Sequence, residues 1–220
     1  MAPATLPPRD ASNPALRTVH PGTWWRVHTL SPRTGLFSPQ AFNASSCGHA
    51  RASPLRASRR AVPVLYAAPT LDGALMGTVL HDMPFPADGH IRDLQRDLQS
   101  DLQASQIRLT APRQLVDLSK LGLQRMGLRV SQMFETDACD HVRTQAWARW
   151  LHMTVPQAQG LHWKCARQPD CAGLMLFGDR AAAGVVAPWA EPSLHVGHSQ
   201  VLGSLLALLQ WLGCGAAPDR

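Results

Sequence analysis

Arginine side chains are concentrated upstream of Tyr66, the only tyrosine of the chain. An arginine presents a planar fork of donors that matches phosphate oxygens, and a tyrosine ring can stack on a heteroaromatic base. Together these groups could hold a dinucleotide without a glycine-rich loop, although a solvated basic loop beside a core tyrosine would have the same sequence. The arginines are Arg26, Arg51, Arg56, Arg59 and Arg60.

Other common catalytic and binding motifs are absent from the sequence. There are ten histidines and five cysteines, but no C-x-x-C or H-E-x-x-H spacing that would hold zinc. There is also no G-x-S-x-G nucleophile turn, no G-x-G-x-x-G loop and no G-x-x-x-x-G-K-[ST] loop. The two glutamates, Glu135 and Glu191, have no acidic companion at the spacing of a catalytic pair. We therefore expect no metal site and no hydrolase triad.

A glycine stands near the middle of a segment that otherwise favours a helix. The strand-like run "VPVLYAA" (62–68) leads through a turn into "TLDGALMGTVLHD" (70–82), which we expect to be helical. Gly77 lies at its centre, where a glycine costs about 1 kcal/mol relative to alanine. Helix formation therefore does not explain this residue.

The elements that would position these residues alternate irregularly along the chain, which predicts an α+β or mixed α/β fold. Residues 1–22 have no periodicity and are expected to form a loose arm, followed by a domain over residues 23–220, in which 31–63 is a long loop. The segment 90–103 repeats leucine every four residues and predicts one amphipathic or extended segment. Strands are expected at 23–30, 62–68, 108–119, 159–167 and 172–180, and helices at 70–82, 140–154 and from Ser199 onward.

The composition is that of a folded, basic protein. The 220 residues are 45% hydrophobic and 16% charged, which is enough for one sizeable core. A net charge of +6 permits attraction to nucleic acid, anionic lipid or a phosphorylated small molecule. The odd number of cysteines and the lack of a secretory start predict a reducing, cytoplasmic compartment. The longest apolar stretch, 201–214, is too short and interrupted for a membrane span.

Several short segments resemble, in order and spacing, the RES-domain family of toxins from Xre–RES toxin–antitoxin modules. The resemblance implies a single α+β domain similar to the ADP-ribosyltransferase toxins, with a mixed central sheet and flanking helices. It also implies cleavage of NAD at the nicotinamide–ribose bond, with transfer of the ADP-ribosyl unit to water, phosphate or a protein. The segments are "WWRVHT", "AFNASSCGHARASPL", "VPVLYAAPTLDGALMGTVLHDMP", "VRTQAWARWL", "GLHWKCARQ" and "LMLFGDR".

The resemblance also assigns site residues to positions of this chain. The family arginine falls on Arg51, its tyrosine on Tyr66 and its helix glutamate on Gly77. A later serine of the family falls near Cys165, and Ala52 replaces an aromatic residue. The catalytic positions implied in this way are Arg51, Tyr66 and Gly77, and the implied NAD-binding residues are Arg26, Asn43, Arg51, Ser53, Tyr66 and Cys165.

The glycine at position 77 leaves three functions to distinguish. The first is an NAD-consuming toxin that is disarmed at Gly77 and is weakly active or inactive, because no carboxylate stabilises the charge that develops on the ribose. The second is a natural inactive relative with a binding or regulatory role, which the departures at Ala52 and Cys165 favour. The third is a basic nucleic-acid-binding module, although the sequence has no recognisable recognition helix.

The resemblance further implies protein partners. RES toxins pair with an Xre-type antitoxin, a helix-turn-helix protein that covers the toxin site, and homodimers are common among them. The apolar C-terminal segment 199–214 is a candidate contact surface, but a buried core helix would have the same composition. We expect no direct binding to nucleic acid and no association with a membrane.

Overall fold

The computed structural model describes residues 6–7, 14–30, 38–44, 50–57, 60–81, 98, 101–134, 141–164 and 171–213. The strands are β1 (Leu16–Val19), β2 (Gly22–Thr29), β3 (Leu55–Ala57), β4 (Arg60–Val62), β5 (Val64–Ala67), β6 (Leu102–Leu109), β7 (Arg113–Asp117), β8 (Gly160–Lys164), β9 (Ala172–Phe177), β10 (Val186–Pro188) and β11 (Leu194–His195). The α-helices are α1 (Leu71–Met76), α3 (Lys120–Arg125), α4 (Val130–Phe134), α5 (His141–Thr154) and α6 (Ser199–Trp211).

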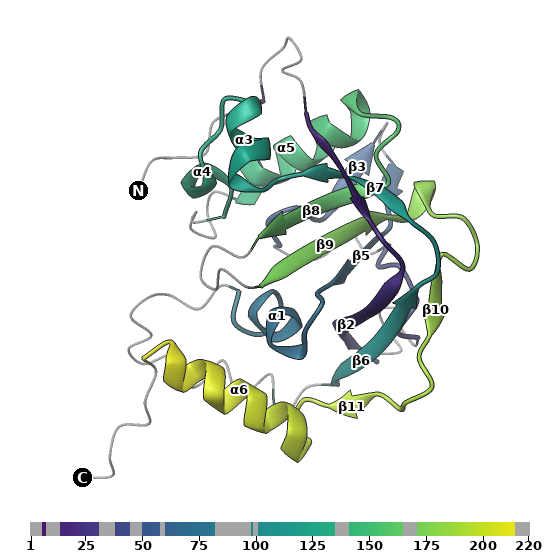
Figure 1. Ribbon diagram of the computed structural model, residues 1–220, viewed down its shortest axis with the longest axis vertical. Coiled ribbons are helices and arrows are strands. Elements are labelled where there is room, and N and C mark those ends of the chain that lie inside the picture. The colour runs from purple at the N-terminus through teal and green to yellow at the C-terminus, as the bar shows by residue number, and fades with distance from the viewer. Residues whose placement is uncertain are drawn as a thin grey trace.

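Two sheets form the centre of the molecule, with helices on their outer sides (Figure 1). The first sheet has the order β1-β7-β8-β9-β5 and is mixed, because β7 and β8 run parallel while the other neighbouring pairs run antiparallel. In the second sheet, β6 pairs with β2 along one edge and with β10 and β11 along the other. This arrangement confirms the predicted α+β fold with a mixed central sheet and flanking helices.

The two sheets meet where β5 ends. Trp25 of β2 and Ala68 exchange two backbone hydrogen bonds, with N···O distances of 2.7 and 2.8 Å. Since Ala68 directly follows β5, this bridge fixes the end of β5 against β2 and sets the start of α1 beside both sheets.

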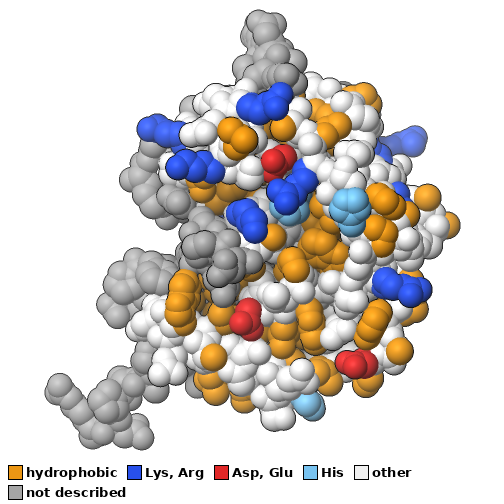
Figure 2. All heavy atoms as spheres, viewed as in Figure 1, with side chains coloured by type: hydrophobic (Ala, Val, Ile, Leu, Met, Phe, Trp, Pro, Cys, Tyr) orange, Lys and Arg blue, Asp and Glu red, His pale blue; other side chains and the backbone are white. Residues whose placement is uncertain are grey.

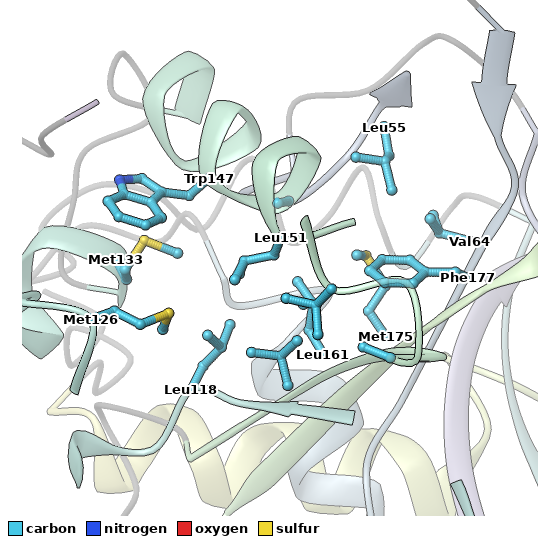
Figure 3. Packing of buried hydrophobic residues seen from close by; sticks show 14 of the residues in the cluster. Leu55, Val64, Leu118, Met126, Met133, Trp147, Leu151, Leu161, Met175 and Phe177 are labelled. Carbon is cyan, nitrogen blue, oxygen red and sulfur yellow. The ribbon is translucent and has the colours of Figure 1, made fainter. Parts of the chain in front are cut away.

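The largest core cluster packs α5 against the first sheet (Figure 3). Trp147 and Leu151 of α5 contribute to it together with Leu161, Met175 and Phe177 from β8 and β9, and each of these side chains is at most 2% exposed. Burial of one such side chain contributes about 1.5–3 kcal/mol to folding. The sequence pattern for α5 and for these two strands is therefore confirmed by the packing.

A second cluster packs α6 against α1 and the second sheet. Leu75 and Leu80, in α1 and the turns after it, are fully buried with Val201 and Leu205 of α6. The inner face of α6 is thus a core face. The C-terminal segment was expected to be either a contact surface or a buried core helix, and this face of α6 is that of a buried core helix.

Three stretches differ from the sequence prediction. Leu16–Val19 forms β1, although it lies in the expected loose arm, because it pairs antiparallel with β7 and becomes the edge strand of the first sheet. The expected long loop 31–63 contains the short hairpin β3–β4. Strand β6, the central strand of its sheet, was predicted only at its ends, which overlap the segment 90–103 and the strand expected at 108–119. The amphipathic segment 90–103 lies mostly outside the described residues.

Helix α1 is shorter than the predicted helix at 70–82. It begins after Thr70, whose hydroxyl accepts a hydrogen bond of 3.1 Å from the N–H of Gly73, and it ends after Met76. Gly77 is the C-cap, with φ −83° and ψ −5°. The expectation that Gly77 lies in the helix interior is therefore wrong, and the interior penalty for glycine does not apply. These dihedral angles are open to any residue type.

Lys and Arg side chains gather in the upper part of the face that Figure 2 shows, around α3. The basic charge seen in the sequence is therefore spread unevenly over this face. None of the helices among the described residues is long and apolar enough to cross a membrane.

Candidate functional site

A cavity of about 920 Å³, a volume that includes its mouth toward solvent, lies beside the end of α1. Arg51, Tyr66 and Gly77 all line it, so the structure brings together the three positions predicted to be catalytic. They come from the turn before β3, from β5 and from the end of α1. The other lining residues are Ala50, Ala52, Met76, His81, Leu118, Met133, Phe134, Thr144, Ala148, Leu161 and Trp163.

Tyr66 is held in place by its hydroxyl. The phenol donates a hydrogen bond of 3.1 Å to the Oγ of Ser53. Burial raises the pKa of Tyr66 to about 12, because the charged phenolate is disfavoured away from water, and the hydrogen bond with Ser53 opposes this shift only in part. Tyr66 is therefore a neutral donor at physiological pH, with its ring facing the cavity.

Two further aromatic rings extend the wall that Tyr66 begins. Trp163 of β8 packs edge-on against Tyr66, with ring centroids 6.1 Å apart, and Phe134 of α4 stacks on Trp163 at 6.3 Å. Sequence reasoning placed Trp163 in a strand but gave it no role, and it did not single out Phe134. Both residues are distant from Tyr66 in the sequence, so no local motif links them to it. The one available signal was that side chains alternate between the two faces of a strand, which places Trp163 on the opposite face from its neighbours in β8.

Gly77 leaves space at the cavity wall. A Cβ built on Gly77 would meet the carbonyl oxygen of Gly73 at 3.3 Å and that of Ala74 at 3.9 Å, so a side chain needs a shift of a few tenths of an ångström at most. Gly77 is exposed, which gives a longer side chain room beyond the Cβ. Position 77 can therefore carry a glutamate if the Gly73 carbonyl moves by a few tenths of an ångström.

No carboxylate among the described residues lines this cavity or the one beside it. His81, one turn beyond Gly77, lines the wall and its Nδ1 donates a hydrogen bond of 2.8 Å to the carbonyl of Thr78. Its ring also stacks with that of His141, with centroids 6.5 Å apart. Within the described part of the chain, the cavity thus has a guanidinium, a phenol and an imidazole but no acid.

A second cavity of about 330 Å³ adjoins the first and shares Tyr66, Gly77 and Trp163 with it. Arg26 of β2 lines this smaller cavity and is only 4% exposed. Its Nη1 donates to the carbonyls of Pro39 and Ala41 at 2.5 and 2.6 Å. Burial lowers the pKa of Arg26 to about 10, so it remains a cation at neutral pH. Arg26 therefore holds the 38–44 segment and also places a positive charge beside the main cavity.

The remaining predicted residues are not gathered at the cavity wall. Ser53 supports Tyr66 from behind through its hydroxyl. Asn43 pairs with Val64 through two backbone hydrogen bonds of 2.7 and 2.9 Å and lines neither cavity. Cys165 lies outside the described residues.

The backbone of the Arg51 turn is held by α5. Thr144 Oγ1 donates to the carbonyl of Arg51 at 2.6 Å, and Thr144 itself touches the cavity. Arg51 and the aromatic rings among the lining residues give the cavity the groups that bind a ligand with both anionic and aromatic parts. The described residues contain no cluster of histidine, cysteine and acidic side chains that could hold a metal ion.

Comparison with known proteins agrees with this geometry. A chain of the M. tuberculosis MbcT–MbcA toxin–antitoxin complex has a similar fold, with a TM-score of 0.56 and 16% sequence identity over 90% of this chain and 92% of that one. No curated protein matches the sequence significantly. The RES domain profile matches residues 23–197. The chain therefore belongs to the RES domain family.

Proposed function

We propose that this protein is a RES-type toxin of a toxin–antitoxin module that binds NAD in the main cavity and cleaves its nicotinamide–ribose bond slowly, because Gly77 stands where a carboxylate is needed. The observation that carries the proposal is that Arg51, Tyr66 and Gly77 line one cavity.

In this proposal Arg51 binds the pyrophosphate of NAD through its guanidinium, which forms paired hydrogen bonds with phosphate oxygens. Tyr66 and Trp163 offer ring faces or edges to a heteroaromatic ring of the ligand. Because Tyr66 is neutral and its single O–H donates to Ser53, its ring can lie beside the ligand without placing a negative charge near the phosphates. Of the residues that line the smaller cavity, Arg26 would add positive potential on the same side of the ligand.

The weak step is the breaking of the glycosidic bond. As the bond between C1′ of the ribose and the nicotinamide nitrogen breaks, positive charge develops on the ribose ring, and nicotinamide leaves as a neutral molecule. A carboxylate near the ribose stabilises that charge and orients the acceptor, whereas Gly77 supplies neither charge nor hydrogen bond. The loss of one such group lowers a rate by about 100- to 1000-fold.

The proposed partner is an antitoxin of the helix-turn-helix type that covers the cavity. Two observations support it: the chain belongs to the RES domain family, and a solved structure of similar fold is a toxin–antitoxin complex. A homodimer of this chain and a cytoplasmic location are part of the same proposal.

The test compares the natural protein with Gly77→Glu and with the neutral, isosteric control Gly77→Gln. Each is expressed with its antitoxin, freed from it, and assayed for NAD binding by calorimetry and for nicotinamide release. We expect all three to bind NAD and only Gly77→Glu to release nicotinamide faster, by about 100- to 1000-fold. If all three proteins released nicotinamide at the same measurable rate, the acid would have been assigned to the wrong position.

A second function remains if NAD binds but Gly77→Glu does not restore turnover. The lack of a carboxylate in the described cavity walls favours this natural, non-enzymatic NAD-binding relative. A failure to bind NAD in any of the three proteins would contradict both functions.

A further inference from the structure

The turn that carries Arg51 is tied to the first turns of α5 through its backbone carbonyls. The turn is closed by a hydrogen bond of 3.3 Å from the N–H of Ser53 to the carbonyl of Ala50.

Gln145 of α5 provides that hold. Its Nε2 donates to the carbonyl of Ala50 at 3.0 Å and to the carbonyl of Ser53 at 2.9 Å. An amide nitrogen has two hydrogens, and these two bonds use both of them. Gln145 therefore bridges the first and the last residue of the turn that has Arg51 inside it.

Gln145 differs from its neighbour Thr144 in one respect that matters for function. Thr144 also bonds to the turn, at the Arg51 carbonyl, but it lines the cavity and would touch a ligand. Gln145 does not line either cavity. Any effect of Gln145 on a ligand must therefore pass through the turn.

The same bridge reaches Tyr66. Ser53, whose carbonyl accepts from Gln145, also accepts the hydrogen bond from the Tyr66 hydroxyl through its Oγ. One amide thus fixes the residue on each side of the Arg51–Ala52 pair and the hydrogen-bond acceptor of Tyr66. Both predicted ligand-binding groups depend on the position of this turn.

We infer that Gln145 is a positioning residue, which holds the 50–53 turn so that Arg51 meets the phosphates of the ligand. The inference rests on the proposed NAD site. Displacement of a binding group by about 1 Å is enough to cost up to about 100-fold in function, even when the altered residue is distant from the ligand. The loss of the bridge would allow such a displacement.

The test removes both donors of Gln145 in a side chain of similar length, Gln145→Met. Thr154→Val is the matched control, because Thr154 Oγ1 donates at 2.8 Å to the carbonyl of Trp150 at the far end of the same helix. We expect Gln145→Met to weaken NAD binding by about tenfold and Thr154→Val to change it by less than about twofold. If Gln145→Met does not fold, Gln145→Leu takes its place.

A double-mutant cycle separates positioning from a general loss of structure. If Gln145 acts through Arg51, then Gln145→Met should add no further loss of NAD affinity in an Arg51→Gln background. Additive losses, or an unchanged affinity in Gln145→Met alone, would overturn the inference.

Hydrogen exchange gives a readout that does not need NAD. The Ser53 amide, which closes the turn, should exchange faster in Gln145→Met than in the natural protein, while Thr154→Val should leave it unchanged. An unchanged exchange rate in Gln145→Met contradicts the inference. If the natural protein does not bind NAD, the proposed function fails, and these exchange rates still decide whether Gln145 holds the turn.

Discussion

Tyr66 shows how one side chain can serve both the fold and the site. Its hydroxyl bonds to Ser53 in the turn beside the cavity, and its ring lines both cavities. The hydrogen bond links β5 to the turn that carries Arg51. Removal of one such bond costs about 1 kcal/mol, so its main value lies in the geometry that it fixes.

Tyr66 should ionise only at strongly alkaline pH in the folded protein. The buried phenol has its pKa raised from 10 to about 12, so the folded state holds its proton where the unfolded state has lost it. The resulting stability is present below pH 10 and is lost as the pH rises from 10 toward 12. Tyr66 is the only tyrosine, so phenolate absorbance reports on it alone.

The expected titration has no phenolate signal near pH 10 and shows the signal near pH 12, with circular dichroism checking that the protein stays folded. Tyr66→Phe is the blank and should show no signal at all. A transition near pH 10 in the folded protein would mean that the ring is not buried as described.

Two strands, one in each of the large sheets, carry buried histidines. His28 of β2 is 4% exposed, and its Nε2 is hydrogen-bonded to the hydroxyl of Ser105 of β6 at 2.8 Å. His162 of β8 is 5% exposed, and its Nδ1 has no hydrogen-bond partner among the described residues. Burial lowers the pKa of each to about 4, and the nearby cations Arg26 and Arg17 add to the shift.

Because these two histidines are buried with lowered pKa values, the protein should lose stability in mild acid. Between pH 6.5 and 4 the unfolded chain binds a proton at His28 that the folded chain does not, so stability is complete above pH 6.5 and falls as the pH decreases toward 4. A shift of this size corresponds to about 3 kcal/mol. The free energy of unfolding, measured in urea at several pH values in this range, should depend less steeply on pH in His28→Gln than in the natural protein. The exposed control His20→Gln should keep the pH dependence of the natural protein.

If His28→Gln kept the pH dependence of the natural protein, His28 would not be the group whose protonation destabilises the fold. The same measurement on His162→Gln tests β8 independently, because the two histidines lie in different sheets.

At the scale of the whole molecule, the folded unit is larger than the segment that matches the family. The RES domain match covers residues 23–197, yet β1 lies before it and α6 lies after it. Helix α6 buries Val201, Leu205 and Leu208 in the cluster that also contains α1. Since Gly77 caps α1, the cavity rests on a helix that α6 supports.

A chain that ends at residue 197 should therefore not fold cooperatively. Each buried side chain of α6 contributes about 1.5–3 kcal/mol, and together they approach the total stability of a typical domain, about 5–15 kcal/mol. Thermal unfolding followed by circular dichroism should show no sharp transition for this chain. The control ends at residue 213 and keeps α6, and it should unfold as the full chain does. Cooperative unfolding of the shorter chain would show that α6 is dispensable.

Elements with strong local patterns could be predicted from the sequence, and so could three residues that line the cavity. β2, β5, β8, β9, α5 and α6 follow from apolar and β-branched runs or from helical periodicity, which act over neighbouring residues. Arg51, Tyr66 and Gly77 were identified by resemblance to the RES family before any geometry was known, and all three line the cavity.

Strands and contacts that need partners distant in the sequence could not be predicted and are seen only in the folded structure. Leu16–Val19 is a strand only because β7 offers it an edge, and β6 is central because β2 pairs along its whole length. The aromatic wall and the bridge from Gln145 join residues from separate helices and strands. Such contacts form when the two sheets and α5 come together, and no local period in the sequence encodes them.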